Sequence, residues 1–263
     1  MKYSEWFLFE RYRNRYRAAT VSLDKKLPQL RKIQQQFVDN RQAEKTGNSN
    51  AKTNSSYYMI ETPIVYNQAL DDVKEIDDIR LILVADNPGR REQAAENRCY
   101  LVGPSGKIAE KFFRDNPSLG IDFRRNVIIL NKTPIHSPRT TDLYDLCRMG
   151  GETLTQALLG SQREMAQFLF DFHDAFSKTP VQVWIIGYSE MKKGGIFEAY
   201  TETLRSLYTQ KSAAARANNI FLFRHFSMNQ FTIDLKQKSS PKKSLEQNLA
   251  DIGTAYRKRI LGW

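Results

Sequence analysis

Cysteine and long hydrophobic runs are the features that this 263-residue sequence has least of. Its two cysteines, Cys99 and Cys147, are too few for a disulfide framework or for a metal site with four cysteine ligands. We therefore expect both to be reduced thiols in a cytoplasmic protein. No stretch approaches the roughly 20 apolar residues that cross a membrane. Residues 1–17 lack the apolar core and the small-residue cleavage site of a secretory signal. These absences predict a protein that stays inside the cell and has no membrane partner.

Positive charge, in contrast, is in excess. The chain has 40 Lys and Arg against 29 Asp and Glu, a formal net charge of +11 and a pI of about 9.6. Such a balance favours nucleic acid as a partner, because cationic side chains displace counterions from phosphate. The alternative is that the charge serves only solubility. The length and the 41% share of hydrophobic residues suit one large domain with an extension, and we expect a monomer.

The first 56 residues differ in character from the rest, so we divide the chain into residues 1–56 and 57–263. From Tyr3 to about Phe37 the pattern is helical and basic, with aromatic residues on one face. Residues 38–56 are polar and contain a Gly-Asn-Ser-Asn stretch, which predicts a flexible loop. A basic helical extension and a polar loop are therefore expected to precede a single α/β domain.

Short apolar runs alternate with amphipathic stretches through the second part. The runs that we expect to be strands are residues 79–84, 126–130, 181–186 and 220–223. The stretches that we expect to be helices are residues 108–113, 152–176, 196–217 and, after a Lys-rich loop, 245–260. This alternation predicts an α/β fold, a three-layer sandwich in which helices flank a central, mainly parallel, four-stranded sheet.

Polar residues collect where these strands are expected to end. Asp86 and Asn87 follow the first strand, Asn131 ends the second, and His225 follows the fourth. The carboxyl ends of parallel strands share one edge, where open α/β sheets bind their ligands. The sequence therefore predicts a site at this edge.

Two motifs give this edge a family resemblance. Residues 85–92 read ADNPGRRE and residues 100–106 read YLVGPSG. The pair resembles the opening motifs of the uracil-DNA glycosylase superfamily. It is closest to the thermophile-type, iron–sulfur-containing branch, whose patterns are Gly-Glu-Ala-Pro-Gly-x-x-Glu and Pro-Phe-Val-Gly-x-Ala-Gly. The strand ending at Asn131 resembles the Ile-Thr-Asn segment of that superfamily, and His225 to Asn229 resembles its late His-Pro-Ser or His-Val-Ser motif. The elements follow the family order over residues of about 79 to 235.

The resemblance implies a fold of the uracil-DNA glycosylase type and a base-excision site. Asp86 matches the family's Glu, and Asn87 matches the amide of the mismatch-specific branch. Either would position water and face the developing sugar cation. Pro88 and Gly89 of the same motif would border the substrate. His225 would hydrogen-bond the departing base as negative charge develops on it.

The resemblance also implies how a flipped base would be held. The amide of Asn131 offers one donor and one acceptor, which match the edge of uracil and not that of cytosine. Leu101 would form an apolar floor beneath the base, and Tyr100 would supply a ring. Structural roles remain the alternative for the polar residues, as turn caps or as a satisfied histidine. His136, in the proline-containing loop, is expected to be mostly structural.

Contacts to the DNA backbone and base stack are expected from hydroxyl groups, an apolar wedge and a basic run. The hydroxyl groups could bind phosphate, the wedge could enter the opened stack, and the run lies beside the wedge. The alternatives are solvated turns, core packing and an ordinary charged surface. The residues are Ser105, Ser137, Ser227, Met228, Lys236, Lys238, Lys242 and Lys243.

Some positions depart from the family pattern. Leu101 replaces the Phe that would stack on uracil, and Phe226 replaces the Pro or Val after the histidine. The four cluster cysteines are absent, so no four-cysteine iron–sulfur cluster can form. We expect no metal and no other cofactor.

Three hypotheses follow. The first is a hydrolase of DNA repair, a monofunctional glycosylase that removes uracil or a related deaminated base. The second is a catalytically inactive relative that binds nucleic acid, which the residues at 101 and 226 favour. The third is an unrelated nucleotide-binding α/β protein, which the lack of a Walker or Gly-x-Gly-x-x-Gly pattern disfavours.

Overall fold

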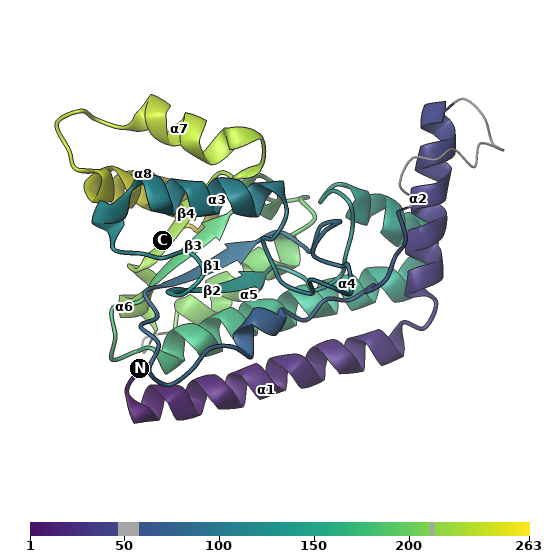
Figure 1. Cartoon of the computed structure of the whole chain (residues 1–263), viewed down its shortest axis with the longest axis horizontal. Helices are drawn as coiled ribbons and strands as arrows, with labels where there is room; N and C mark the ends of the chain where they lie inside the picture. Colours follow the sequence, from purple (N-terminus) through teal and green to yellow (C-terminus); the bar gives the residue numbers. More distant parts are fainter. Residues whose placement is uncertain (47–57, 211–212) are drawn as a thin grey trace.

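Four parallel strands form the centre of the structure, a computed structural model that describes residues 1–46, 58–210 and 213–263 (Figure 1). The sheet order is β2-β1-β3-β4, and every neighbouring pair is parallel. The strands are β1 (Leu81–Ala85), β2 (Val127–Asn131), β3 (Gln182–Ile186) and β4 (Ile220–Phe223). The expected four-stranded parallel sheet is confirmed, with the strand positions shifted by at most two residues.

The strands are apolar without alternation because helices cover both faces of the sheet. In Figure 1, α3, α7 and α8 lie above the sheet, and α4 and α5 lie below it. These helices span α3 (Pro104–Asp115), α4 (Asp142–Ala175), α5 (Glu198–Tyr208), α7 (Gln230–Lys238) and α8 (Leu245–Leu261). The helix–sheet–helix sandwich confirms the expected α/β layers.

The strand order explains which helix covers which face. The connection from β1 to β2 runs in one direction along the sheet, and the connections from β2 to β3 and from β3 to β4 run in the other. Because crossovers between parallel strands are right-handed, opposite directions place the connecting helices on opposite faces. The loops that follow β1 and β3 therefore diverge from adjacent strands, which opens a crevice at the carboxyl edge.

The N-terminal segment forms two helices, α1 (Tyr3–Lys26) and α2 (Leu30–Thr46). Residues 3–37 are helical as expected except for a break between Lys26 and Leu30, where Pro28 lacks an N–H and restricts the residue before it. The expected loop from residue 38 was wrong up to Thr46, and its remainder, residues 47–56, lies outside the described residues, as does the start of the expected domain at residue 57.

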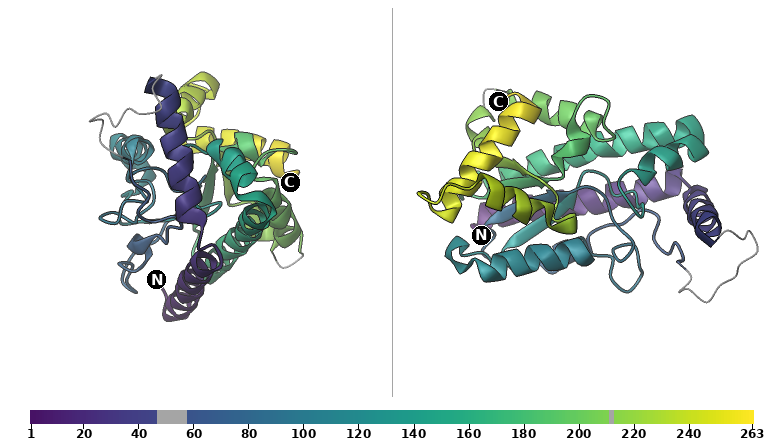
Figure 2. Two further views of the ribbon diagram at one scale, coloured as in Figure 1. Left: turned by 90° about the vertical axis from the view of Figure 1, so that its right-hand side faces the viewer. Right: turned by 90° about the horizontal axis from the view of Figure 1, so that it is seen from above.

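Helix α1 lies along α4 (Figure 2). Aromatic side chains join the two helices. The ring centroids of Phe9 and Phe172 lie 5.5 Å apart. The hydroxyl group of the buried Tyr16 lies 2.6 Å from that of Tyr100, which itself donates to the carbonyl of Val65. The N-terminal helix therefore reaches the loop that carries the second motif.

Other boundaries also differ from expectation. Helix α4 begins at Asp142, before the expected residue 152, and bends at Gly151. The expected helix over residues 196–217 is divided into α5 and α6 (Ala214–Ala217), with residues 211–212 outside the described part. The described residues also form four short 3-10 helices: η1 (Gln68–Leu70), η2 (Pro117–Leu119), η3 (Tyr188–Met191) and η4 (Ser227–Asn229).

Two expected turns are partly helical. The glycine-rich turn of residues 103–106 is the start of α3, with Gly103 as its N-cap. The Lys-rich loop begins only after α7, whose buried residues are Phe231 and Asp234 and whose last turn holds two of the lysines. Among the residues that the structure describes, no helix combines the length and the apolarity needed to cross a membrane.

Candidate active site

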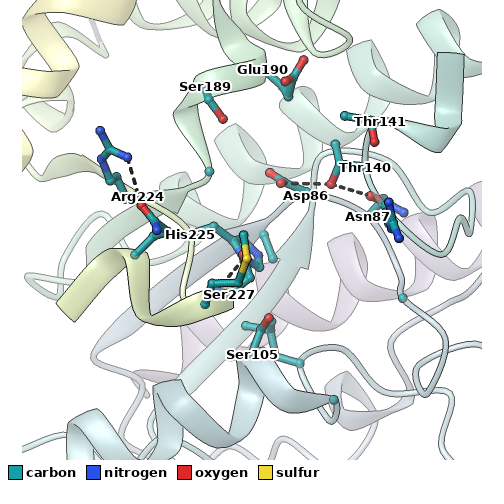
Figure 3. Close-up of a pocket in the computed structure, with 18 of the residues that line it drawn as sticks. Asp86, Asn87, Ser105, Thr140, Thr141, Ser189, Glu190, Arg224, His225 and Ser227 are labelled. Atoms are coloured by element: carbon teal, nitrogen blue, oxygen red, sulfur yellow. Dashed lines mark hydrogen bonds between the residues drawn. The ribbon is translucent and has the colours of Figure 1, made fainter. Parts of the chain in front are cut away.

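A cavity of about 960 Å³ opens at the carboxyl ends of the strands (Figure 3). Its wall comes from the loops after all four strands, from the N-terminus of α3, and from α7 and α8. This volume lies at the upper end of the range of ligand pockets, about 300–1,000 Å³. The cavity therefore has room for more than a single base.

The wall carries more positive than negative groups. In the described part of the chain, six cationic side chains and three carboxyl groups line it. The cationic residues are Arg90, Arg91, Arg139, Arg224, Lys238 and Arg259, and the acidic ones are Asp86, Glu92 and Glu190. An anionic ligand is the natural occupant of such a cavity.

Asp86 and Asn87 project from the end of β1 toward a single hydroxyl group (Figure 3). The hydroxyl oxygen of Thr140 lies 3.2 Å from Oδ2 of Asp86 and 3.1 Å from Oδ1 of Asn87. The amide nitrogen of Asn87 donates to the hydroxyl group of Ser137, at 2.9 Å. The loops after β1 and β2 therefore fix both side chains at the cavity wall.

A buried lysine forms an ion pair with Asp86. The ammonium group of Lys132 lies 2.6 Å from Oδ1 of Asp86 and 2.6 Å from the carbonyl oxygen of Ile186, and its side chain is 0% exposed. Desolvation lowers the pKa of Lys132, and the nearby carboxylate of Asp86 opposes that shift. The carboxylate, whose own side chain is 14% exposed, thus presents its other oxygen to the cavity while one oxygen stays on the ammonium group.

His225 follows β4 and lines the same cavity. Its Nδ1 accepts a hydrogen bond from the backbone N–H of Ser227, at 3.0 Å. Burial lowers the pKa of His225, with Asp86 opposing and Lys132 reinforcing the shift. A neutral ring that accepts at Nδ1 carries its proton on Nε2. The imidazole is therefore a neutral hydrogen-bond donor.

Glu92 links the two motifs at and beyond the end of β1, residues 85–92 and 100–106. Its carboxylate accepts from the backbone N–H of Gly89, at 2.8 Å, and from that of Leu101, at 2.7 Å. Burial raises the pKa of Glu92 to about 7, although the two backbone N–H groups act in the opposite direction. The carboxyl group holds Leu101, whose φ is +53°, at the wall of the cavity.

The structure brings most of the expected site residues to this one cavity. Those that line it are Asp86, Asn87, Gly89, Leu101, Ser105, Ser137, His225, Ser227, Met228 and Lys238. Met228 is 79% exposed and has a φ of +52°. The expected residues that do not line it are Pro88, Tyr100, Asn131, Lys236, Lys242 and Lys243.

Asn131 and Tyr100 lie in the interior. Asn131 is 1% exposed, and neither polar atom of its amide has a hydrogen-bond partner in the described residues. Tyr100 is equally buried and uses its hydroxyl group on Val65 and Tyr16. Tyr100 therefore links the second motif to α1 and does not present its ring to the cavity.

The buried carbonyl of Pro88 and the lysines have other contacts. The carbonyl oxygen of Pro88 accepts a hydrogen bond from the Nδ1–H of His136, at 2.7 Å, which fits the structural role expected for that histidine. Lys238 pairs with Asp234, at 3.0 Å, and Lys243 pairs with the exposed Asp251. The basic run thus divides between the cavity wall and the outer surface.

Sequence reasoning missed Lys132, Thr140 and the two arginines Arg224 and Arg259. A lysine directly after a buried strand is a usable signal, because burial of an ammonium group requires acceptors nearby. Thr140 and Arg259 carry no such local signal, since they reach the cavity only through the folding of distant segments. Among the described residues, no group of His, Cys, Asp and Glu side chains could hold a metal ion.

No family model matches this chain, and no curated protein or solved structure matches it either. What the cavity can do must therefore be judged from its own side chains.

Proposed function

We propose that this chain is a DNA glycosylase of the uracil-DNA glycosylase type, which hydrolyses the N-glycosidic bond of uracil or a related deaminated base. One observation carries the proposal: Asp86 and His225, from the ends of two different strands, line the same cavity (Figure 3). A carboxylate and a neutral hydrogen-bond donor are the two groups that this reaction requires at opposite ends of the bond that breaks.

The chemistry follows from those two groups. The target base leaves the stack and enters the cavity. As the C1′–N bond breaks, its electron pair departs with the base and the sugar becomes cationic. The carboxylate of Asp86 stabilises that cation and accepts a proton from the attacking water, whose oxygen forms the new bond to C1′. The hydroxyl group of Thr140 helps to fix the carboxylate.

His225 serves the other end of the bond. Negative charge develops on the carbonyl oxygen of the departing pyrimidine, and the Nε2–H of a neutral imidazole can donate to it. A neutral imidazole can donate this hydrogen bond without first binding a proton. Its contribution to catalysis therefore persists at physiological pH. The lowered pKa of His225 supports this role.

Phosphate contacts are proposed for the mouth of the cavity. Ser105 lies in the first turn of α3, whose N-cap Gly103 contributes no side-chain hydrogen bond. The N-terminus of a helix favours anions because its N–H groups and its dipole both point outward. The exposed Met228, held at the rim, is suited to enter the gap that a flipped base leaves.

Base selection is proposed for Asn131. Its buried amide has both a free donor and a free acceptor, and buried polar groups are normally satisfied. The edge of a pyrimidine would satisfy both. Because Asn131 lies behind the wall, this contact requires the wall near it to open when the base enters.

Single-turnover cleavage of end-labelled DNA tests the proposal. Each substrate carries one uracil, hypoxanthine or xanthine, in single strands and in mismatched duplexes. We expect product with one of these bases, loss of product in Asp86→Ala and His225→Ala with nearly unchanged DNA binding, and altered base choice in Asn131→Asp. Thr140→Ala should slow excision. The matched control is Thr155→Ala, because its hydroxyl group donates only within α4, to Gly151.

A nucleic-acid-binding protein without catalysis is the second candidate. Two observations favour it: the ion pair that occupies one oxygen of Asp86, and the position of Asn131 behind the cavity wall. Under this alternative no base is released from any substrate, while the wild-type protein binds DNA in a salt-sensitive way.

A further inference from the structure

Three cationic residues form one side of the cavity, and we call Arg224, Lys238 and Arg259 the cationic wing. Arg224 directly follows β4, Lys238 ends α7, and Arg259 lies in the last turn of α8. Segments far apart in the sequence thus place three positive charges on the wall that also carries His225. Figure 3 shows Arg224 and His225 across the cavity from Asn87.

A buried carboxylate organises two members of the wing. Oδ1 of Asp234 lies 3.0 Å from the ammonium group of Lys238 and 3.5 Å from Nε of Arg224. The hydroxyl group of Tyr256 donates to the same carboxylate at 2.8 Å. Asp234 is 5% exposed, whereas the side chains of Arg224 and Lys238 are about half exposed, so the buried carboxylate neutralises part of the charge while the two cationic groups remain accessible.

Arg259 is held by aromatic rings. Its guanidinium carbon lies 5.1 Å from the ring centroid of Tyr188 and 4.8 Å from that of Tyr256, and the two rings are 4.4 Å apart. Cation–π contacts of this kind orient a guanidinium group without using its hydrogen-bond donors. Among the described residues, no carboxylate pairs with Arg259, so its donors stay available to a ligand.

The charge of the wing exceeds what its neighbours neutralise. Among the described residues, the carboxylate of Asp234 pairs with two of the three cationic groups, Arg224 and Lys238. The other lysines of the basic run differ, because Lys236, Lys242 and Lys243 do not line the cavity and Lys243 is paired with Asp251. The cationic wing therefore contributes positive charge to the cavity wall, whereas the other lysines of the basic run do not.

We propose that Arg224, Lys238 and Arg259 bind the phosphate backbone of the nucleic-acid strand beside the nucleotide that occupies the cavity. The proposal rests on the proposed function in that its partner is nucleic acid. Guanidinium groups match phosphate oxygens in pairs, and a pre-oriented guanidinium group loses little freedom when it binds. Arg139 and other cationic residues across the cavity would receive the backbone on the far side. The strand then crosses the mouth with the reacting nucleotide between two cationic margins.

The salt dependence of DNA binding tests this assignment with a matched pair of variants. Arg259 and Lys258 are neighbours on α8, both exposed, but only Arg259 lines the cavity. Fluorescence anisotropy with an undamaged oligonucleotide gives the slope of log Kobs against log salt concentration. Arg259→Gln should reduce the slope by roughly 0.7 on single strands or 0.9 on duplex, the value of one phosphate contact. Lys258→Gln should leave it unchanged.

A second comparison extends the test to the whole wing. The triple variant R224Q/K238Q/R259Q should reduce the slope by about 2 to 3, and the equally charged triple K236Q/K242Q/K243Q should not. Because two members of the wing pair with the buried Asp234, the first triple could unfold; the single Arg259→Gln variant leaves those pairs intact. Equal slopes for Arg259→Gln and Lys258→Gln, or a larger effect of K236Q/K242Q/K243Q, would overturn the proposal.

Excision assays separate this proposal from the proposed function. If the wild-type protein releases no base but Arg259→Gln lowers the salt slope, the wing binds phosphate and the glycosylase activity is refuted. If the wild-type protein releases a base while Arg259→Gln binds with an unchanged slope, the activity stands and the wing is refuted. Wild-type binding that does not respond to salt refutes the wing in either case.

Discussion

The ammonium nitrogen of Lys132 lies 2.6 Å from Oδ1 of Asp86, and the lysine side chain has no exposure to solvent. The same nitrogen donates to the carbonyl oxygens of Ile186, at 2.6 Å, and of Ala85, at 3.4 Å. Its three donors therefore meet three acceptors, at the ends of β1 and β3. Lys132 is a positioning residue for Asp86, because it orients the carboxylate and does not itself reach the cavity.

Separating this pair should be costly, and more so from the side of the aspartate. Asp86→Asn leaves a fully buried ammonium group without a counter-charge and should lower the free energy of unfolding by about 3–5 kcal/mol. Lys132→Met leaves a carboxylate that is 14% exposed, so water can compensate part of its loss. The double variant should be more stable than Asp86→Asn. Urea unfolding measures all three, and additive losses in the double variant would contradict the coupling.

The Asp86→Asn variant should also gain stability as the pH rises. Burial already lowers the pKa of Lys132 below its usual 10.5, and removal of Asp86 takes away the group that opposes the shift. Between the lowered pKa and 10.5 the unfolded chain binds a proton that the folded chain does not, so the free energy of unfolding increases with pH. The wild-type protein should show less of this increase in urea unfolding from pH 7 to 10.

The layers and the carboxyl-edge site could be predicted because apolar strands and the polar residues after them are local signals. The direction of a side chain at a strand end is not local. Successive residues of a strand face opposite sides, so a small error in where β2 leaves the sheet decides whether Asn131 or Lys132 approaches Asp86. The sequence placed Asn131 in the site as the base-binding residue, whereas its amide is buried without a partner among the described residues and Lys132 contacts Asp86. The break at Pro28 carried a readable signal, but the contact of Thr140 with Asp86 depends on tertiary folding alone.

His225 should act as a neutral donor throughout the physiological pH range. Burial lowers its pKa below the usual 6.5, so the imidazolium form appears only at more acidic pH. The excision rate should therefore not fall through protonation of His225 between pH 8 and 6.5, and His225→Ala should lower the rate by about 10²–10³-fold at every pH in this range. The ¹⁵N shifts of the ring should report a proton on Nε2. A doubly protonated ring at pH 7 would contradict the assignment.

Glu92 should make the protein less stable as the pH rises from about 5 to 8. Burial raises its pKa to about 7 from the 4.5 of an exposed group. The folded chain therefore holds a proton that the unfolded chain has released, and that advantage is lost as the pH rises through 7. The loss from this group is about 3 kcal/mol.

The Glu92→Gln variant isolates this effect, because a glutamine does not titrate. Urea unfolding should show that the pH-dependent loss is smaller in Glu92→Gln than in the wild-type protein. Glu96→Gln, in the same loop but at an exposed position, should keep the wild-type dependence. Amide hydrogen exchange at Gly89 and Leu101 should also be faster in Glu92→Gln, because an amide cannot accept from both N–H groups as the carboxylate does. Parallel pH curves for Glu92→Gln and the wild-type protein would show that another group causes the loss.

Gly187 should be required for the position of Asp86, and Gly194 provides the matched control. Both glycines have a left-handed backbone, with φ of +80° and +75°. A Cβ atom at Gly187 would lie 2.4 Å from Oδ1 of Asp86, whereas a Cβ atom at Gly194 meets no atom within 4 Å. Gly194→Ala should therefore lower the free energy of unfolding only by the cost of the backbone strain, about 1–2 kcal/mol in urea unfolding. It should keep wild-type excision. Gly187→Ala adds the displacement of Asp86 from Lys132, so it should lose more stability and also slow single-turnover excision. Similar losses in the two variants would mean that Asp86 moves aside without cost, and the carboxylate would then not be fixed in the way that its contacts with Lys132 and Thr140 imply.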